Sequence, residues 1–277
     1  MTAEALAQAK VNLTLHVTGQ RTDGYHLLDS LVMFADVGDV VRVTMADTTS
    51  VTVQGPMAKD VPADESNLVW QAARMMGACA EIVLEKHLPH AAGLGGGSAD
   101  AAATLRLVSR LTETPIPGDL TRLGADVPVC LGNRAARMQH IGDRITPMRD
   151  LPALYAVLVN PGLAVPTAEV FAHLANKANP PMPDEIPPME DGGALTDWIR
   201  GMRNDLEAAA IQVQPRIAQV LKAIEVTGGC QLSRMSGSGA TCFGLYRNAE
   251  TAGSAAGRLK EEFPAWWVAN TRLNAPS

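Results

Sequence analysis

The strongest chemical signal in the sequence is a run of glycines that leads into an alanine-rich segment. Four glycines fall within five residues, at Gly93, Gly95, Gly96 and Gly97, and Ser98 follows them. Apolar residues then recur at helical spacing, which predicts a helix over 98–112. Glycines let the backbone approach an anion closely, and the free N–H groups of a helix start point at it. A tight turn also uses glycine, but it does not need three in a row. The pattern therefore predicts a phosphate-binding loop.

The two common nucleotide motifs do not match this loop. A Walker loop requires Gly-Lys-Ser/Thr, whereas Gly97 is followed directly by Ser98. A dinucleotide fingerprint requires glycine or alanine at position 98 or 100, where Ser98 and Asp100 stand. We therefore expect a phosphate cradle of another class.

Two charged residues, Lys10 and Asp126, could each have either a catalytic or a purely structural role. The alternation of apolar and polar residues predicts a strand over 11–17, so Lys10 and Asn12 share its polar face. Lysine on a strand is most often simply solvated. Asp126 stands in the turn Gly-Ala-Asp-Val-Pro, where aspartate is also favoured as a cap. From the residues alone, the cap interpretation leads.

Two further segments are ambiguous in the same way. The sequence Ser-Gly-Ser-Gly-Ala over 236–240 joins two strand-like runs and is as typical of a structural turn as of a second anion loop. Tyr25 and His26 follow Asp-Gly at the exit of a loop. They either pack locally or stack on a ligand.

Composition excludes several classes of protein. The 277 residues are 47% apolar and 19% charged, with a net charge of −6, which is typical of a folded globular chain. The acidic total argues against nucleic acid or a membrane surface as partner. The four cysteines form no Cys-x-x-Cys pair, so we expect no metal site made of them. The first ten residues lack a basic head and an apolar run, which predicts a cytoplasmic protein.

The order of strand and helix patterns predicts an α+β fold with two layered domains, over 1–150 and 151–277. We expect a surface loop over the proline-rich residues 178–188. A single helix is predicted over 194–212 and another over 215–227.

Three segments together resemble the GHMP kinase superfamily. They are residues 9–26, 86–102 and 235–240, and 124–128 and 167–171 also match in order. The stretch Asp-Gly-Tyr-His at 23–26 is similar only to the cytidine-binding branch. The resemblance implies an N-terminal domain of ribosomal-protein-S5-like fold, a ferredoxin-like C-terminal domain, and a cleft for ATP and substrate.

The reaction that this resemblance implies is phosphorylation of the 2-hydroxyl of a cytidyl-diphosphate-linked methylerythritol, in the non-mevalonate route to isoprenoids. ATP would be the donor and Mg²⁺ would neutralise its phosphates. Asp126 would accept or orient the hydroxyl proton, and Lys10 would hold Asp126 ionised. We expect a monomer or weak homodimer.

The resemblance also implies the binding residues. Those for the nucleotide are Asn67, Leu68, Lys86, Pro89, Gly93, Leu94, Gly95, Gly96, Gly97 and Ser98. Those for the substrate are Asn12, Tyr25, His26, Thr167, Phe171, Gly237, Ser238 and Gly239, with Tyr25 and Phe171 sandwiching the cytosine. The family often has glycine where Ala91 stands and serine where Ala99 stands.

Two alternatives remain at this point. One is a related GHMP kinase for another small alcohol, and the other is a catalytically silent nucleotide sensor. Tyr25, His26 and Phe171 count against the first, because such an alcohol has no base to stack. The presence of both Lys10 and Asp126 counts against the second.

Overall fold

The computed structural model describes residues 1–274, which form two compact units. Unit 1 comprises Met1–Lys10, Val37–His90 and Gly95–Asn133. Unit 2 comprises Val11–Asp36, Ala91–Leu94 and the chain from Arg134 onward. The units are interleaved along the chain, and a single domain boundary at residue 150 stays a prediction.

Unit 1 is built on a mixed sheet. Its strands are β1 (Thr2–Asn12) and β3 (His26–Met45), which continue into unit 2, with β4 (Ser50–Gln54) and β5 (Ala80–Glu85). Strand β5 pairs antiparallel with the end of β3, and β4 runs parallel to β5. Ala80, Ile82 and Leu84 are buried in β5 whereas Glu81 is exposed, so one face of this strand covers a core.

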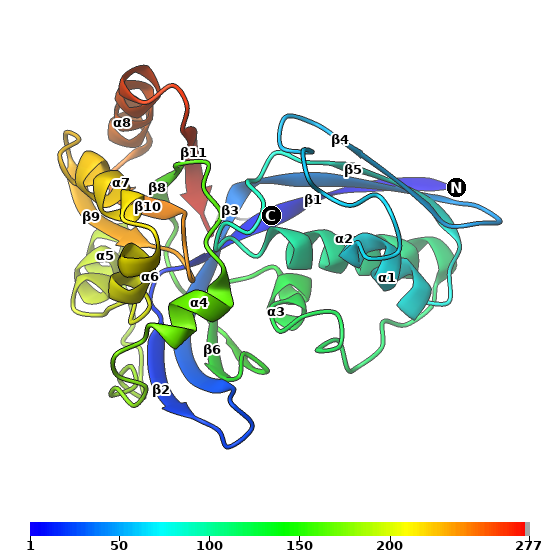
Figure 1. Cartoon of the computed structure of the whole chain (residues 1–277), viewed down its shortest axis with the longest axis horizontal. Helices are drawn as coiled ribbons and strands as arrows, with labels where there is room; N and C mark the ends of the chain where they lie inside the picture. The colour runs from blue at the N-terminus through cyan, green and yellow to red at the C-terminus, as the bar shows by residue number, and fades with distance from the viewer. Residues whose placement is uncertain (275–277) are drawn as a thin grey trace. The chain divides into compact units, whose positions relative to one another are not determined.

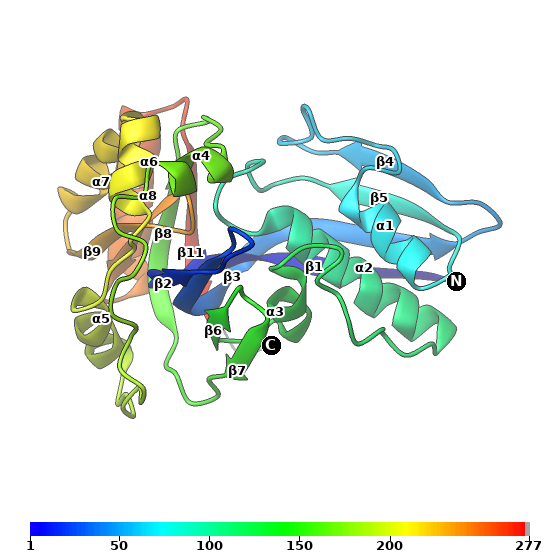
Figure 2. The same ribbon diagram turned by 60° about the horizontal axis from the view of Figure 1, so that its bottom comes forward.

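Three helices cover one side of this sheet (Figure 1). They are α1 (Leu68–Met75), α2 (Gly96–Thr112) and α3 (Val127–Gly132). Helix α2 packs on both of the others, and Figure 2 shows α1 alongside it. The alanines of α2, such as Ala101 and Ala103, are fully buried, so the middle of α2 lies in the core of unit 1 while Gly97 at its start is exposed.

The second unit contains an antiparallel sheet in the order β11 (Trp267–Leu273), β8 (Leu154–Asn160), β10 (Cys242–Tyr246) and β9 (Cys230–Met235). Helices α7 (Arg216–Glu225) and α8 (Ala249–Glu262) lie on one side of it (Figure 1). Val157 and Val159 of the sheet share a buried cluster with Ile217, Val220 and Leu259 of these helices.

The rest of unit 2 surrounds the N-terminal half of β3. Strands β2 (His16–Gln20) and β6 (Ala136–His140) pair with it, and β7 (Arg144–Pro147) pairs with β6. Three helices complete the unit: α4 (Thr167–Ala172), α5 (Gly192–Arg200) and α6 (Glu207–Val213).

Two sequence-based predictions about elements are wrong, for one shared reason. The strand expected over 11–17 is the end of β1 and the start of β2, and the helix expected over 194–212 is split into α5 and α6. The two interruptions bond to each other: Leu15 N–H donates to the Arg203 carbonyl at 2.9 Å, and Asp205 N–H donates to the Leu15 carbonyl at 2.8 Å. Tertiary hydrogen bonds thus override the local periodicity.

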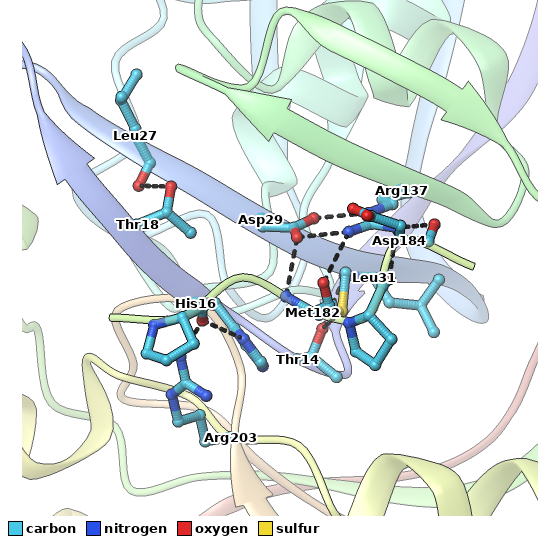
Figure 3. A network of polar contacts seen from close by, with 12 residues as sticks. Thr14, His16, Thr18, Leu27, Asp29, Leu31, Arg137, Met182, Asp184 and Arg203 are labelled. Atoms are coloured by element: carbon cyan, nitrogen blue, oxygen red, sulfur yellow. Dashed lines mark hydrogen bonds and ion pairs between the residues drawn. The ribbon is translucent and has the colours of Figure 1, made fainter. Parts of the chain in front are cut away.

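The proline-rich segment expected as a surface loop is mostly exposed, but Met182 is buried within it. Asp29 and Arg137, themselves a buried ion pair, hold this segment (Figure 3). Asp29 accepts the Met182 N–H at 3.0 Å, and Arg137 donates to the carbonyls of Pro183 and Asp184 at 2.9 and 2.7 Å. We call residues 180–184 the strap.

Within residues 1–274, no helix is both long and apolar enough to cross a membrane.

Candidate active site

The first glycine loop ends at a helix start with no side-chain cap. Gly95 is the residue before α2 and has a φ of +63°, which favours glycine. No side chain of the described chain caps α2, and its first turn contains no acidic residue. The first N–H groups of α2 therefore remain available for an anion, and the helix dipole favours negative charge there.

Lys10 and Asp126 form an ion pair directly beside this helix start. Lys10 Nζ lies 2.8 Å from Asp126 Oδ2, and the lysine side chain is 6% exposed against 33% for the aspartate. A β-carbon at Gly95 would lie 3.2 Å from Cε of Lys10 and 3.6 Å from Oδ2 of Asp126. Because Gly95 has no side chain, nothing at this position stands between the loop backbone and the Lys10–Asp126 ion pair.

The cap interpretation of Asp126 is wrong, as is the solvated-surface interpretation of Lys10. Asp126 precedes α3, but its side chain caps no backbone N–H of that helix. Lys10 is buried, and its ammonium is bonded to the carboxylate. A part-exposed carboxylate fixed in place by a buried lysine is the arrangement expected of a positioned general base.

The residues beside the loop also bear on whether a metal could be held there. Residues 1–274 contain no group of three or more His, Cys, Asp or Glu side chains placed to hold a metal ion. One carboxylate, Asp126, and one hydroxyl, Ser98, flank the loop: a β-carbon at Gly124 would lie 3.5 Å from Ser98 Oγ. This donor set fits a Mg²⁺ ion that takes most of its ligands from phosphates and water.

Lys86, expected beside the nucleotide, has a buried ammonium that is bonded to two carboxylates. It donates to Asp100 Oδ2 at 2.8 Å and to Asp39 Oδ2, and the three side chains are at most 5% exposed. Burial alone would lower the pKa of Lys86, but the charges of Asp100 and Asp39 outweigh it and raise that pKa. Asp39 also accepts the N–H groups of His87 and Leu88 at 2.6 and 2.8 Å. The cluster therefore shapes the backbone that leads into the loop.

Asn67 and Leu68 lie at the start of α1, next to that of α2. The Asn67 side chain caps α1 by accepting the Val69 N–H at 3.0 Å. A β-carbon at Gly97 would lie 3.5 Å from Leu68 Cδ1, so the two helix starts are adjacent. Pro89 is half-buried on the segment before the loop.

In unit 2, the remaining part of the first loop is bonded to the second glycine loop. Ser236 Oγ donates to the Gly93 carbonyl at 2.9 Å, and Thr241 N–H donates to that of Ala92 at 3.1 Å. A β-carbon at Gly93 would lie 2.3 Å from the Ser236 carbonyl oxygen, so only glycine fits there. Leu94, next along, is buried.

The expected substrate residues of unit 2 gather around the second loop. Thr167 Oγ1 lies 2.8 Å from Ser238 Oγ. Phe171, one turn further along α4, stacks on His26 with ring centroids 4.6 Å apart and planes 21° apart. Burial and the charge of Lys177 lower the pKa of His26, which favours the neutral imidazole. The Nε2 atom of His26 is buried and has no partner within residues 1–274.

Tyr25 does not join this group. Its side chain is 63% exposed at the tip of the β2–β3 hairpin, and it is His26 that stacks on Phe171. In this structure the ring that stacks on Phe171 is therefore that of His26 and not that of Tyr25.

Asn12, Gly237 and Gly239 complete the group in unit 2. Asn12 is 3% exposed, and a β-carbon at Gly237 would lie 3.4 Å from its Oδ1 atom. Gly239 has a φ of +87°, and a β-carbon there would lie 2.8 Å from Met235 Sδ.

Sequence reasoning missed several residues that support the site. Asp39, Asp100, Ser30 and Ser236 are all buried and bonded to the expected residues or to their backbone. Two of them carried a signal: Asp100 is a charged residue among the buried alanines of α2, and Ser236 opens the glycine loop over 236–240. Asp39 and Ser30 look like ordinary strand residues.

Comparison with known proteins gives a consistent result. The model described as GHMP kinases N terminal domain matches residues 67–143, and GHMP kinases C terminal matches 190–265. The 4-diphosphocytidyl-2-C-methyl-D-erythritol kinase of Cereibacter sphaeroides (strain ATCC 17025 / ATH 2.4.3) is 52% identical, over 98% of this chain and 99% of that protein. The protein of that name from Roseobacter denitrificans is 49% identical, over 98% of this chain and 94% of its own length.

Solved structures agree. A crystal structure of 4-(cytidine 5'-diphospho)-2C-methyl-D-erythritol kinase superposes with a TM-score of 0.77 at 33% identity, covering 99% of this chain and 100% of the other. Homoserine kinase from Cytophaga hutchinsonii shares the fold, with a TM-score of 0.68 at 19% identity, covering 98% of this chain and 95% of the other.

Proposed function

Because the chain belongs to the GHMP kinases and, within them, to the 4-diphosphocytidyl-2-C-methyl-D-erythritol kinases, we propose that it transfers the γ-phosphate of ATP to the 2-hydroxyl of 4-diphosphocytidyl-2-C-methyl-D-erythritol. This reaction belongs to the non-mevalonate route to isoprenoid precursors. The observation that carries the proposal is the Lys10–Asp126 ion pair beside an uncapped, glycine-rich helix start.

Asp126 acts as the general base in this proposal. Its carboxylate is part-exposed and bonded to Lys10 at 2.8 Å, which fixes its position. It accepts the proton of the attacking hydroxyl as the bond from that oxygen to the γ-phosphorus of ATP forms and the bond from this phosphorus to the ADP oxygen breaks, so that ADP leaves. Lys10 then stabilises the charge that develops on the transferring phosphoryl group.

The start of α2 binds the phosphates of ATP. The N–H groups of Gly96, Gly97 and Ser98 are donors that the helix does not use, and the macrodipole adds partial positive charge. A Mg²⁺ ion would neutralise negative charge on the phosphates of ATP. Ser98 and Asp126 are the side chains that would face it. Leu68 and the backbone near Lys86 border the nucleoside.

The residues of unit 2 recognise the cytidyl-diphosphate. Phe171, which stacks on His26 with one face, offers an aromatic surface for the cytosine, and Tyr25 as the second side of a sandwich stays a prediction. Neutral His26 reads the polar edge of the base through its free Nε2 atom. Thr167, Ser238 and the glycines of the second loop approach the diphosphate.

The variant Asp126→Asn tests the mechanism. The amide keeps the shape of the side chain but cannot accept the hydroxyl proton, so we expect kcat to fall by about two to four orders of magnitude. Affinity for ATP, measured by calorimetry, stays close to that of the wild type. Asp119→Asn, at an exposed turn of the same unit, removes the same charge and serves as the control. Unchanged turnover in Asp126→Asn would remove this residue from the mechanism.

A competition among acceptors tests the substrate. ATP consumption is measured with the cytidyl-diphosphate alcohol, with mevalonate and with homoserine at equal concentrations. The proposal requires that the first is used with the highest kcat/KM. Preference for mevalonate or homoserine would replace it with a related kinase for a small alcohol.

A further inference from the structure

The backbone of Asn12 is held from one side by the second glycine loop. Its N–H donates to Ser236 Oγ at 3.0 Å, and the same hydroxyl donates to the Gly93 carbonyl at 2.9 Å. Ser236 is fully buried. Ser236 therefore fixes the main chain at Asn12 relative to the two glycine segments of unit 2, at Gly93 and at 236–240.

The side chain of Asn12 is held from another side by Ser30 of β3. Asn12 and Ser30 make a contact of 2.8 Å between Nδ2 and Oγ, and Ser30 Oγ lies 2.5 Å from the carbonyl oxygen of Thr14. A carbonyl only accepts hydrogen bonds, so the one proton of Ser30 points to Thr14. Ser30 presents only lone pairs to Asn12, and the amide must turn its NH₂ group toward Ser30.

This direction of hydrogen bonding leaves the amide oxygen facing away from Ser30. Asn12 Oδ1 is buried and has no partner among residues 1–274. A side chain at Gly237 would occupy the space beside it, since a β-carbon there would lie 3.4 Å from Oδ1. A buried acceptor without a partner in the described chain is suited to a donor group on a ligand.

We propose that Ser30 is a positioning residue that orients Asn12 Oδ1 to accept a hydrogen bond from a hydroxyl group of the alcohol part of the substrate. The inference rests on the proposed function. A phosphate cannot take this position, because its ionised oxygens are acceptors and would face another acceptor. Asn12 is two residues beyond Lys10 in β1, the spacing that returns to the same strand face about 7 Å away. The alcohol hydroxyls are therefore the matching donors.

The variant Ser30→Ala tests the inference through a split between ligands. Without the Ser30 acceptor, the Asn12 amide is free to turn, and we expect KM for the cytidyl-diphosphate alcohol to rise about tenfold, the effect of one lost hydrogen bond. KM for ATP stays within about twofold of the wild type. The inhibition constant of cytidine diphosphate, which lacks the alcohol, also stays within about twofold, because Asn12 Oδ1 does not contact it.

Thr14→Val is the matched control. The Thr14 side chain is fully buried, accepts the Leu31 N–H at 2.9 Å and donates to Met182 Sδ at 3.0 Å (Figure 3). The proton of Ser30 goes instead to the main-chain oxygen of Thr14, which valine retains. This variant therefore lowers the melting temperature, and KM for the alcohol substrate stays unchanged.

Ser30→Cys provides a second test should the alanine variant fold poorly. The thiol keeps a weaker donor and acceptor at the same place, so KM lies between those of the wild type and Ser30→Ala. The inference is overturned if Ser30→Ala leaves KM unchanged, if cytidine diphosphate weakens as much as the full substrate, or if Thr14→Val raises KM equally. A wild-type enzyme that does not use the alcohol would instead overturn the proposed function.

Discussion

Asp100 shows how a single buried charge can set the pH response of the protein. It shares Lys86 with Asp39, so two carboxylates meet one ammonium, and its Oδ1 atom has no partner within the described chain. Burial, opposed by the charge of Lys86 and reinforced by that of Asp39, raises the pKa of Asp100 to about 7. The folded protein therefore binds a proton here more tightly than the unfolded chain does.

A pH dependence of stability follows from this shift. The stabilisation is fully present below the pKa of about 4 that Asp100 has when unfolded, and it is lost as the pH rises through about 7. We expect Asp100→Asn to remove this decline, because the amide stays neutral at every pH. Urea denaturation of both proteins between pH 5 and 8 measures it. The same slope in both would show that Asp100 does not titrate in this range.

Lys86 shows how a tertiary contact determines what a side chain binds. The family resemblance placed this lysine near the nucleotide, which stays a prediction. In the structure its ammonium is bonded to Asp100 and Asp39. No local pattern reveals this, because Asp39 precedes Lys86 by 47 residues.

At the scale of elements, the first turn of α2 is suited to phosphate binding but lowers the stability of the helix. Two consecutive glycines, Gly96 and Gly97, open the helix, and no side chain of the described chain caps it. Each glycine costs about 1 kcal/mol relative to alanine in a helix. We infer that the bare first turn is retained because a capping side chain would compete with phosphate for the same N–H groups.

The variant Gly97→Asp separates the two effects. Gly97 is exposed, and its φ lies outside the left-handed region, so a side chain can be built there. A carboxylate in the first turn stabilises the helix by about 0.3–1 kcal/mol through the dipole. It also repels the phosphates of ATP. We expect a higher melting temperature together with a KM for ATP raised at least tenfold.

Gly97→Ala is the control for that experiment. Alanine gains the helix propensity without adding charge, and its β-carbon lies 3.5 Å from Leu68 Cδ1, an ordinary contact. Stability therefore rises, and KM for ATP changes much less than in Gly97→Asp. Equal effects of the two substitutions on KM would mean that the added side-chain volume, and not the charge, weakens ATP binding at the loop.

Local sequence pattern predicted some helices correctly and others only in part. The helix predicted over 215–227 is confirmed as α7, because Pro215 and the glycines after it mark its ends. The helix predicted over 194–212 is interrupted, because Asn204 Oδ1 accepts the Leu206 N–H and starts a new turn. Such an interruption depends on hydrogen bonds to Leu15, in the break between β1 and β2, and local periodicity does not contain this information.

At the scale of the whole chain, the Asp29–Arg137 pair joins segments that are 108 residues apart. Its two contacts measure 2.8 and 2.6 Å, and both side chains are almost fully buried. Hydrogen bonding to Asp29, against the cost of burial, raises the pKa of Arg137. Arg137 also donates to the carbonyl of Met182 in the strap, 45 residues further along the chain.

Arg137→Met should therefore be strongly destabilising. It leaves Asp29 buried without a cation, which costs about 3–5 kcal/mol of unfolding free energy. Arg42→Met serves as the comparison, because the Arg42–Glu4 pair is half exposed and such pairs contribute about 0–1 kcal/mol. Urea denaturation measures both. Similar losses in the two variants would contradict a special role for the buried pair.

The sequence by itself determined the α+β class, the glycine-rich helix start and the GHMP kinase resemblance, because these depend on residues that are adjacent or at short periodic spacing. Tertiary structure alone decided that Lys10 meets Asp126, 116 residues away, and that Lys86 meets two aspartates. It also decided which way the Asn12 amide faces, since that depends on where the Ser30 proton goes. Pairing and hydrogen-bond direction are properties of positions in space, and a linear pattern does not contain them.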